Sequence, residues 1–220
     1  MLDYIIQKFV FQIMKSHFIA QLLFKIDFNP VKKGAYYFDT STIVMTRLLL
    51  KEIHTHDRIL DMGTGVSAIV GLFLWKHCGC HVVSCDINPD IVLMAQENIR
   101  LNKSPIRVIH SNLFENIDED FDIVVFNPPY VPTKKGIIYN LSKKFQSQWD
   151  GGQDGGLVVK QFLNELHKIT RPVKAYVGIN YKLLPKENFL SIIEINKNLK
   201  LKKISRHPIL PIEIFVIEKT

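Results

Sequence analysis

One stretch of the chain joins a strand pattern to residue types that suit chemistry on nitrogen. Apart from Asp122, residues 121–126 are β-branched or aromatic, and they end abruptly at Asn127, Pro128, Pro129 and Tyr130. Neither proline has an N–H, so the strand must end there, and a residue before proline favours extended backbone. The corner therefore presents a carboxamide, backbone carbonyls without neighbouring N–H donors, and an aromatic ring against which a planar group can pack. Because ligands of open α/β sheets bind at this carboxyl edge, we predict a catalytic centre here, and methyl transfer to nitrogen is the hypothesis that the rest of the sequence tests.

A second cluster surrounds a glycine-containing turn after another predicted strand. Asp61, Gly63, Thr64 and Gly65 stand at the end of the strand pattern of residues 58–62. Glycine lets a ligand approach the backbone closely because it has no Cβ. The third glycine of the dinucleotide fingerprint is missing, and a carboxylate beside the turn suits an ammonium and a sulfonium better than a pyrophosphate. The turn therefore favours S-adenosylmethionine as the ligand.

Two more strand ends carry residues that suit this ligand. Asp86 ends the strand pattern of residues 81–86, where an acid accepts hydrogen bonds from ribose hydroxyls, and Ile87 follows it. Asn112 comes after the third strand and can hydrogen-bond an adenine, with an apolar neighbour such as Leu113 covering the ring face. An ordinary strand-end loop is the alternative interpretation of Asn112.

These residues resemble the class I S-adenosylmethionine-dependent methyltransferases, and most closely the HemK/PrmC-type glutamine N5-methyltransferases. The similarity runs from about Gly34 to the C-terminus. The matching segments are residues 61–65 for the cofactor loop, Asp86 for the ribose acid, residues 127–130 for the substrate motif, Asp39 and Thr40 for the acid–threonine pair before the cofactor domain, and residues 151–155 for a later glycine turn.

The resemblance implies a site in which the Asn127 side-chain oxygen and the Pro128 carbonyl each accept one N–H of a target amide. Tyr130 then forms a flat wall, and Thr40 joins the residues that hold S-adenosylmethionine. The expected substrate is a protein glutamine side chain of the release-factor type. Three alternatives stay open: adenine N6 methylation of RNA or DNA, N-methylation of a small metabolite, and a non-enzymatic interaction protein on a methyltransferase scaffold.

The remaining patterns predict the framework that positions these residues. Strands that alternate with helices pair in parallel through right-handed crossovers. The predicted strands are residues 58–62, 81–86, 106–110, 121–126 and 175–179, and the predicted helices are residues 66–77, 89–102, 157–170 and 185–196. A helix over residues 42–54, with Thr40 or Ser41 as its N-cap, precedes them. Residues 134–150 form a long polar connector.

The ends of the chain complete the predicted fold. Residues 201–206 and 212–217 are expected to form an antiparallel C-terminal edge. We therefore predict a Rossmann-like, doubly wound α/β fold with a mostly parallel, seven-stranded sheet. Residues 3–26 predict one added apolar helix, so residues 1–30 are separated from a methyltransferase domain of residues 31–220. This helix covers its own domain, a second copy in a homodimer, or a lipid or substrate surface.

Composition limits the class of protein. Hydrophobic residues make up 47% of the chain, which excludes global disorder, and the net charge of +7 weakly favours an acidic or nucleic-acid partner. Three cysteines fit a reducing compartment, and the close pair Cys78 and Cys80 is spaced too tightly for a zinc ribbon, so no metal is expected. Neither a signal peptide nor a clean membrane span is evident, which predicts a cytoplasmic location.

Overall fold

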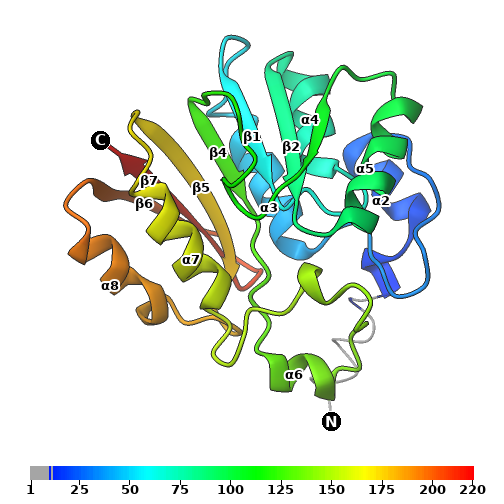
Figure 1. Ribbon diagram of the computed structural model, residues 1–220. Coiled ribbons are helices and arrows are strands. Elements are labelled where there is room, and N and C mark those ends of the chain that lie inside the picture. Colours follow the sequence, from blue (N-terminus) through cyan, green and yellow to red (C-terminus); the bar gives the residue numbers. More distant parts are fainter. Residues whose placement is uncertain (1–9, 11) are drawn as a thin grey trace.

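The structure is a computed structural model that describes residue 10 and residues 12–220, and it contains one seven-stranded sheet (Figure 1). The strands are β1 (Arg58–Met62), β2 (His81–Asp86), β3 (Arg107–His110), β4 (Ile123–Phe126), β5 (Val173–Asn180), β6 (Leu199–Arg206) and β7 (Ile212–Lys219). They lie in the order β3-β2-β1-β4-β5-β7-β6. The first five strands pair in parallel, and β7 is antiparallel to both β5 and β6.

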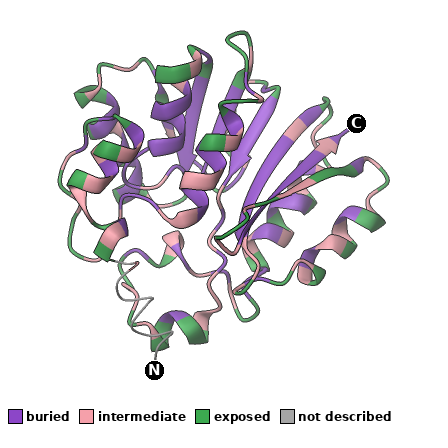
Figure 2. Cartoon of the chain, turned by 180° about the vertical axis from the view of Figure 1, so that it is seen from behind, coloured by how far each residue is buried: buried purple, intermediate pink, exposed green. Residues whose placement is uncertain are grey.

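Helices cover both faces of the sheet. They are α2 (His17–Phe24), α3 (Thr40–Leu49), α4 (Ile69–Cys78), α5 (Pro89–Leu101), α6 (Thr133–Ile138), α7 (Leu157–Leu166) and α8 (Glu187–Ile195). Side chains of α2 to α5 pack on one face and those of α7 and α8 on the other. Neighbouring strand residues such as Val124 and Val125 point into opposite layers, so the central strands are buried throughout (Figure 2).

The predicted fold class is confirmed, including the antiparallel C-terminal part of the sheet. The strand at the edge, however, is β6, while β7 lies inside the sheet between β5 and β6. All eight residues of β5 pair with β7, from Val173 opposite Lys219 to Asn180 opposite Ile212.

Several predicted helix boundaries were wrong for local reasons. Asp39, not Thr40 or Ser41, caps α3, because its side chain accepts a hydrogen bond from the Thr42 N–H at 2.8 Å. Helix α4 begins at Ile69 rather than at residue 66, because Ala68 adopts left-handed backbone with a φ of 49°.

The N-terminal segment differs from a single helix in the part that the structure describes. Residues 12–14 are helical, a turn follows, and Ser16 caps α2 by accepting a hydrogen bond from the Ile19 N–H at 3.3 Å. The start of the predicted helix, residues 3–9, lies outside the described residues. Phe24 packs edge-on against Phe38 and Phe73, so this face of α2 covers its own domain.

The connector after the fourth strand is more ordered than its polar composition predicts. It contains α6 and a 3₁₀ turn (Gln146–Gln148), and it is anchored by the buried side chains of Phe145 and Trp149. The indole N–H of Trp149 donates to the Ser142 carbonyl at 2.9 Å. Within the described residues, none of the helices is both long and apolar enough to cross a membrane.

Candidate active site

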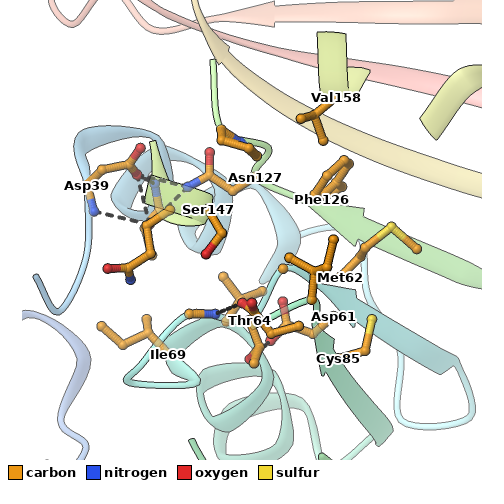
Figure 3. A pocket seen from close by; sticks show the side chains of 18 of the residues that line it. Asp39, Asp61, Met62, Thr64, Ile69, Cys85, Phe126, Asn127, Ser147 and Val158 are labelled. Carbon is orange, nitrogen blue, oxygen red and sulfur yellow. Dashed lines mark hydrogen bonds between the residues drawn. The ribbon is translucent and has the colours of Figure 1, made fainter. Parts of the chain in front are cut away.

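A cavity of about 230 Å³ opens at the carboxyl ends of β1, β2 and β4. It brings together most of the residues that were predicted to hold the cofactor, and Figure 3 shows several of them. The predicted residues that line it are Asp61, Gly63, Thr64, Gly65, Asp86, Ile87, Asn112, Leu113, Asn127 and Pro129. Residues from three parallel strands thus converge on one hollow, as expected for a doubly wound sheet.

Asp61 holds the glycine turn in place. Its Oδ2 accepts hydrogen bonds from the Thr64 hydroxyl at 2.6 Å, the Gly71 N–H at 3.0 Å and the Ser84 hydroxyl at 3.3 Å. This single oxygen therefore ties the turn to α4 and β2. Burial raises the pKa of Asp61 to about 6, although these three hydrogen bonds oppose the rise.

Asp86 faces the same turn from the end of β2. Its Oδ2 accepts a hydrogen bond from the Gly65 N–H at 3.1 Å, and its Oδ1 accepts one from the Asn88 N–H at 3.0 Å. Each carboxylate oxygen has a second lone pair, so both can still accept a hydrogen bond from a ligand hydroxyl. Burial raises the pKa of Asp86 to about 6, although the backbone N–H groups lower it.

Asn127 has its side-chain amide fixed by the first turn of α3. Its Nδ2 donates to Asp39 Oδ1 at 3.0 Å, and both residues are labelled in Figure 3; it also donates to the Thr42 hydroxyl at 3.3 Å. Because the nitrogen is held by acceptors, the orientation of the amide is defined. Its Oδ1 is buried and has no hydrogen-bond partner among the described residues. An unpartnered buried acceptor costs about 1–3 kcal/mol, which a ligand donor can offset.

Tyr130 is buried and does not line the larger cavity. Its hydroxyl donates to Asp39 Oδ2 at 2.7 Å and lies 2.7 Å from the Ser41 hydroxyl. Burial raises the pKa of Tyr130 well above its ordinary value, and the charge of Asp39 adds to the rise. The phenol thus stays protonated, and its hydrogen bonds to Asp39 and Ser41 connect the proline corner to the start of α3.

A smaller cavity of about 90 Å³ adjoins the corner from the other side. Thr40, Pro128 and Tyr130, which were predicted as site residues, line this second cavity and not the larger one. No donor in the described part of the chain is hydrogen-bonded to the Pro128 carbonyl. The predicted residues are therefore divided between two cavities that meet at Asn127.

Four residues line both cavities and mark their junction: Tyr36, Asp39, Asn127 and Gln148. The sequence-based site list omitted Tyr36, Asp39 and Gln148. The Tyr36 hydroxyl donates to the Gln148 carbonyl at 2.6 Å, which joins the connector before α3 to the 3₁₀ turn. The signals available from the sequence were the acid–threonine pair for Asp39 and the length of the polar connector for Gln148.

The later glycine turn, residues 151–155, packs directly on the proline corner. The Val131 N–H donates to the Trp149 carbonyl at 2.8 Å, and the Gly151 N–H donates to the Val131 carbonyl at 2.9 Å. Gly155 has a φ of +81°, and a Cβ there would lie 2.6 Å from the Tyr130 carbonyl oxygen. The turn therefore supports the proline corner by packing directly against Tyr130 and Val131.

The region around the two close cysteines is a helix-to-strand turn. Helix α4 ends at Cys78, Gly79 caps it, and β2 starts at His81. Among the described residues, one group of three potential metal ligands lies within 4.8 Å, and it consists of His54, His56 and Asp57. None of the three lines either cavity.

Comparison with known proteins decides the family. A family model of the methyltransferase small domain matches residues 36–174, more than half of the chain. The chain belongs to this family. The matched region contains the glycine turn of residues 61–65, Asp86 and the proline corner of residues 127–130. It ends within β5.

Relatives with similar sequences include two described as glutamine methyltransferases. The chain is 40% identical over 129 residues to a release factor glutamine methyltransferase of Agrobacterium fabrum, covering 53% of this chain and 44% of the relative. It is 35% identical over 108 residues to a candidate protein N5-glutamine methyltransferase of Methanocaldococcus jannaschii, covering 49% of this chain and 53% of the relative. The chain thus spans about half the length of these curated relatives.

Solved structures agree on the fold. A methyltransferase from Pyrococcus furiosus superimposes with a TM-score of 0.68 at 20% identity, over 97% of both chains. A chain of the Mtq2–Trm112 complex of E. cuniculi, which methylates a translation termination factor, gives a TM-score of 0.57 at 24% identity, over 84% of this chain and 98% of that chain.

Proposed function

We propose that the protein uses S-adenosylmethionine to methylate the side-chain amide nitrogen of a protein glutamine, with a release factor as the substrate. The observation that carries this proposal is the Asn127 carboxamide: the residue lines both cavities, and its buried Oδ1 has no partner in the described structure. An oriented acceptor at such a junction suits an N–H donor that enters from the smaller cavity.

The residues of the larger cavity fit S-adenosylmethionine. Gly63 and Gly65 offer bare backbone with φ values of 64° and 67°, and Asp86 retains acceptor capacity for ribose hydroxyls. Two buried carboxylates, Asp61 and Asp86, stabilise a ligand that carries positive charge. Ile87, Asn112 and Leu113 form the remaining wall, which suits an adenine.

The cofactor supplies an electrophilic methyl group on a sulfonium sulfur, which leaves as a neutral thioether. The contribution of this chain is to orient the acceptor. An amide nitrogen is a weak nucleophile because its lone pair is delocalised, so catalysis must come from position and electrostatics. Asn127 Oδ1 accepts one N–H and turns the nitrogen toward the methyl carbon. One amide proton then leaves to water after the N–C bond has formed. The resemblance assigns the other N–H to the Pro128 carbonyl.

The names of the relatives support a protein substrate. Curated relatives from A. fabrum and Haemophilus influenzae are release factor glutamine methyltransferases, 40% and 30% identical over the matched regions. An adenine amino group also carries two N–H donors, and the net charge of +7 favours a nucleic acid, so adenine N6 methylation is the second candidate. That alternative predicts RNA or DNA binding that weakens steeply with salt.

The N-terminal segment has a proposed role outside the chemistry. Phe18 and Leu22 are 72% and 66% exposed on the face of α2 opposite Phe24. The described part of residues 1–30 thus covers the domain of residues 31–220, and the exposed face of α2 offers a contact to a second copy or to the substrate. We further propose that the protein acts in the cytoplasm, where translation factors are available.

The test compares the wild-type protein with Asn127→Ala. We expect the variant to lose methyl transfer to a purified release factor by about 100-fold or more. Its affinity for S-adenosylhomocysteine, measured by calorimetry, should be retained because Asp86 and the glycine turn are unchanged. Normal turnover in Asn127→Ala would overturn the proposed mechanism. Transfer to RNA and not to the release factor would favour the second candidate.

A further inference from the structure

A cluster of potential metal ligands lies in the turn between α3 and β1, outside both cavities. It consists of His54, His56 and Asp57, whose ligand atoms all lie within 4.8 Å of one another. The proposed methyl transfer uses none of them, because none lines either cavity. Two imidazoles and one carboxylate are a ligand set that zinc accepts in proteins. The turn is therefore a candidate for chemistry separate from that of the cavities.

The backbone of this turn holds the carboxylate in place. The His54 N–H donates to Asp57 Oδ2 at 2.7 Å, and the Asp57 N–H donates to the His54 carbonyl at 3.0 Å. These two reciprocal hydrogen bonds close the turn, and the side chain of Asp57 is only 14% exposed. Since the backbone N–H is bonded to Oδ2, the other carboxylate oxygen, Oδ1, keeps its full capacity for an ion.

The two imidazoles face this carboxylate at distances longer than a hydrogen bond. His54 Nδ1 lies 3.7 Å from Asp57 Oδ2, and His56 Nε2 lies 3.8 Å from Asp57 Oδ1. A direct N–H···O bond would bring these atoms to about 2.7–3.2 Å. Two ligands of one tetrahedral zinc, each at about 2.0–2.1 Å from it, are instead about 3.3–3.4 Å apart. The histidine side chains are 69% and 83% exposed, so small rotations can close the remaining gap.

The turn lies against the end of α4 that carries the two close cysteines. The Thr55 hydroxyl donates to the Cys78 carbonyl at 3.1 Å. Cys78 is half-buried and Cys80 is buried, and neither belongs to the group of ligand atoms within 4.8 Å. The expectation of no metal was based on the spacing of these cysteines and did not consider the turn. The geometry therefore assigns imidazole and carboxylate, not thiolate, as the ligands.

We propose that His54, His56 and Asp57 bind one divalent transition-metal ion of the Zn²⁺ type, with water completing the coordination. Zinc takes four ligands, and this turn supplies three of them. Helix α3 starts next to Asp39, and β1 ends at the glycine turn. The ion thus joins the far ends of two elements that carry the cavities. It stabilises the folded chain and takes no part in methyl transfer.

Calorimetric titration of the metal-free protein with ZnCl2 tests the site. The proposal predicts one ion per chain and a Kd that weakens about tenfold or more in His56→Ala and in Asp57→Asn. Asparagine keeps an acceptor for the His54 N–H, so this variant separates ion binding from the fold of the turn. The matched control is His167→Ala, which removes an imidazole at the end of α7 and should bind Zn²⁺ as the wild-type protein does.

Thermal denaturation gives a second readout. Free Zn²⁺ at about 100 times its Kd should raise the Tm of the wild-type protein by about 5–10 °C. The Tm of His56→Ala should hardly respond to the same concentration. Without added metal the two proteins should have equal circular dichroism spectra, because the His56 side chain is 83% exposed.

Three results would overturn the proposal. Equal Zn²⁺ affinity in the wild-type protein and in His56→Ala would show that binding is adventitious. Replacement of Zn²⁺ by Co²⁺ tests the ligand type, since a thiolate-to-cobalt charge-transfer band would assign the ion to the cysteines. No binding up to about 1 mM free Zn²⁺ would leave the turn as a connection between α3 and β1 and nothing more.

Discussion

Asp39 fixes the orientation of the catalytic corner through hydrogen bonds to three other residues. It caps α3 through Thr42, holds Nδ2 of Asn127 and accepts the Tyr130 hydroxyl. Because Asn127 Nδ2 is held by this carboxylate, Asn127 Oδ1 is the atom left for the substrate. Exchange of oxygen and nitrogen in that amide would present a donor to an NH2 group, which cannot accept it.

Asp39→Ser separates the orienting role from helix capping. Serine is a good N-cap, so capping is kept, and the free energy of unfolding should fall by about 1–3 kcal/mol through the lost hydrogen bonds to Asn127 and Tyr130. Loss of the charged acceptor should still lower kcat/KM by about 10- to 100-fold, equivalent to about 1.5–3 kcal/mol. Steady-state kinetics and thermal denaturation of the same preparation provide the check. Equal activity in Asp39→Ser would show that Asn127 keeps its orientation without the carboxylate.

The two buried acids predict a pH dependence of cofactor binding. Burial raises the pKa of both Asp61 and Asp86 to about 6. A cationic ligand favours the ionised acids, so affinity for S-adenosylmethionine should rise from pH 5 to about pH 7 and then level off. The stability of the ligand-free protein should instead fall as pH rises from about 4 to about 6. Acids whose pKa values are raised in the folded state destabilise the fold as they ionise.

Calorimetry with S-adenosylmethionine across this pH range tests the assignment. Asp86→Asn should bind more weakly and show a flatter profile, since one of the two titrating groups has been removed. A profile in Asp86→Asn as steep as that of the wild-type protein would mean that Asp86 does not sense the ligand. Asp61 is less suitable for substitution because its Oδ2 holds the turn together.

At the scale of elements, the glycine turn of residues 151–155 makes a structural prediction. Gly155→Ala places a side chain at a φ of +81° and brings its Cβ to 2.6 Å from the Tyr130 carbonyl oxygen. The left-handed backbone alone costs about 1–2 kcal/mol, or about 2–8 °C in Tm for a chain of this size. Activity should fall further, because the clash displaces the corner.

Gly156→Ala is the matched control for this prediction. Its new Cβ would meet the flexible end of Lys160 at 3.2 Å, and its φ is −98°. We expect it to keep both the melting temperature and the activity of the wild-type protein. If both alanine variants behave alike, close packing of the turn on Tyr130 is not what the glycines provide.

The sequence predicted the elements better than their ends. The central strands were recognised because runs such as residues 123–126 are apolar and are followed by prolines, which end a strand. The start of α4 was missed because an alanine gives no sequence signal for the left-handed backbone that Ala68 adopts. The 3₁₀ turn was missed because its order comes from Phe145 and Trp149, whose burial depends on distant residues.

Residues of the site were also predicted only in part. Residues at strand ends, such as Asp61, Asp86 and Asn127, could be brought together from topology alone, since parallel strands share a carboxyl edge. Gln148 could not, because it reaches the junction from a connector whose path depends on tertiary contacts. Sequence spacing also could not separate the two cavities.

At the scale of the whole molecule, β7 lies between β5 and the edge strand β6, outside the region that the family model matches. Residues Ile212, Ile214, Phe215 and Ile217 of this strand are 0% exposed. Burial of four such side chains contributes about 6–12 kcal/mol, comparable with the total stability of a domain, which is about 5–15 kcal/mol. A chain that ends at Arg206 should therefore fail to fold, as circular dichroism and soluble yield would show.

A shorter deletion is the control for the removal of residues at the C-terminus. Removal of Thr220 alone takes away two hydrogen bonds, from its N–H to the Asn198 carbonyl at 2.9 Å and from Lys219 Nζ to the Thr220 carbonyl at 2.8 Å, and should leave the protein folded. A folded, cooperative unfolding transition in the chain that ends at Arg206 would show that β5 tolerates an unpaired edge.

The position of β7 also affects how the protein leaves the ribosome. Synthesis delivers β5 and then β6, yet the strand between them in the finished sheet is made last. Until residues 212–219 have emerged, β5 presents an open edge on which β6 or another nascent chain can pair. The charged side chains of Lys200, Lys202 and Lys203 make β6 a poor early partner, which leaves the place beside β5 to the later strand.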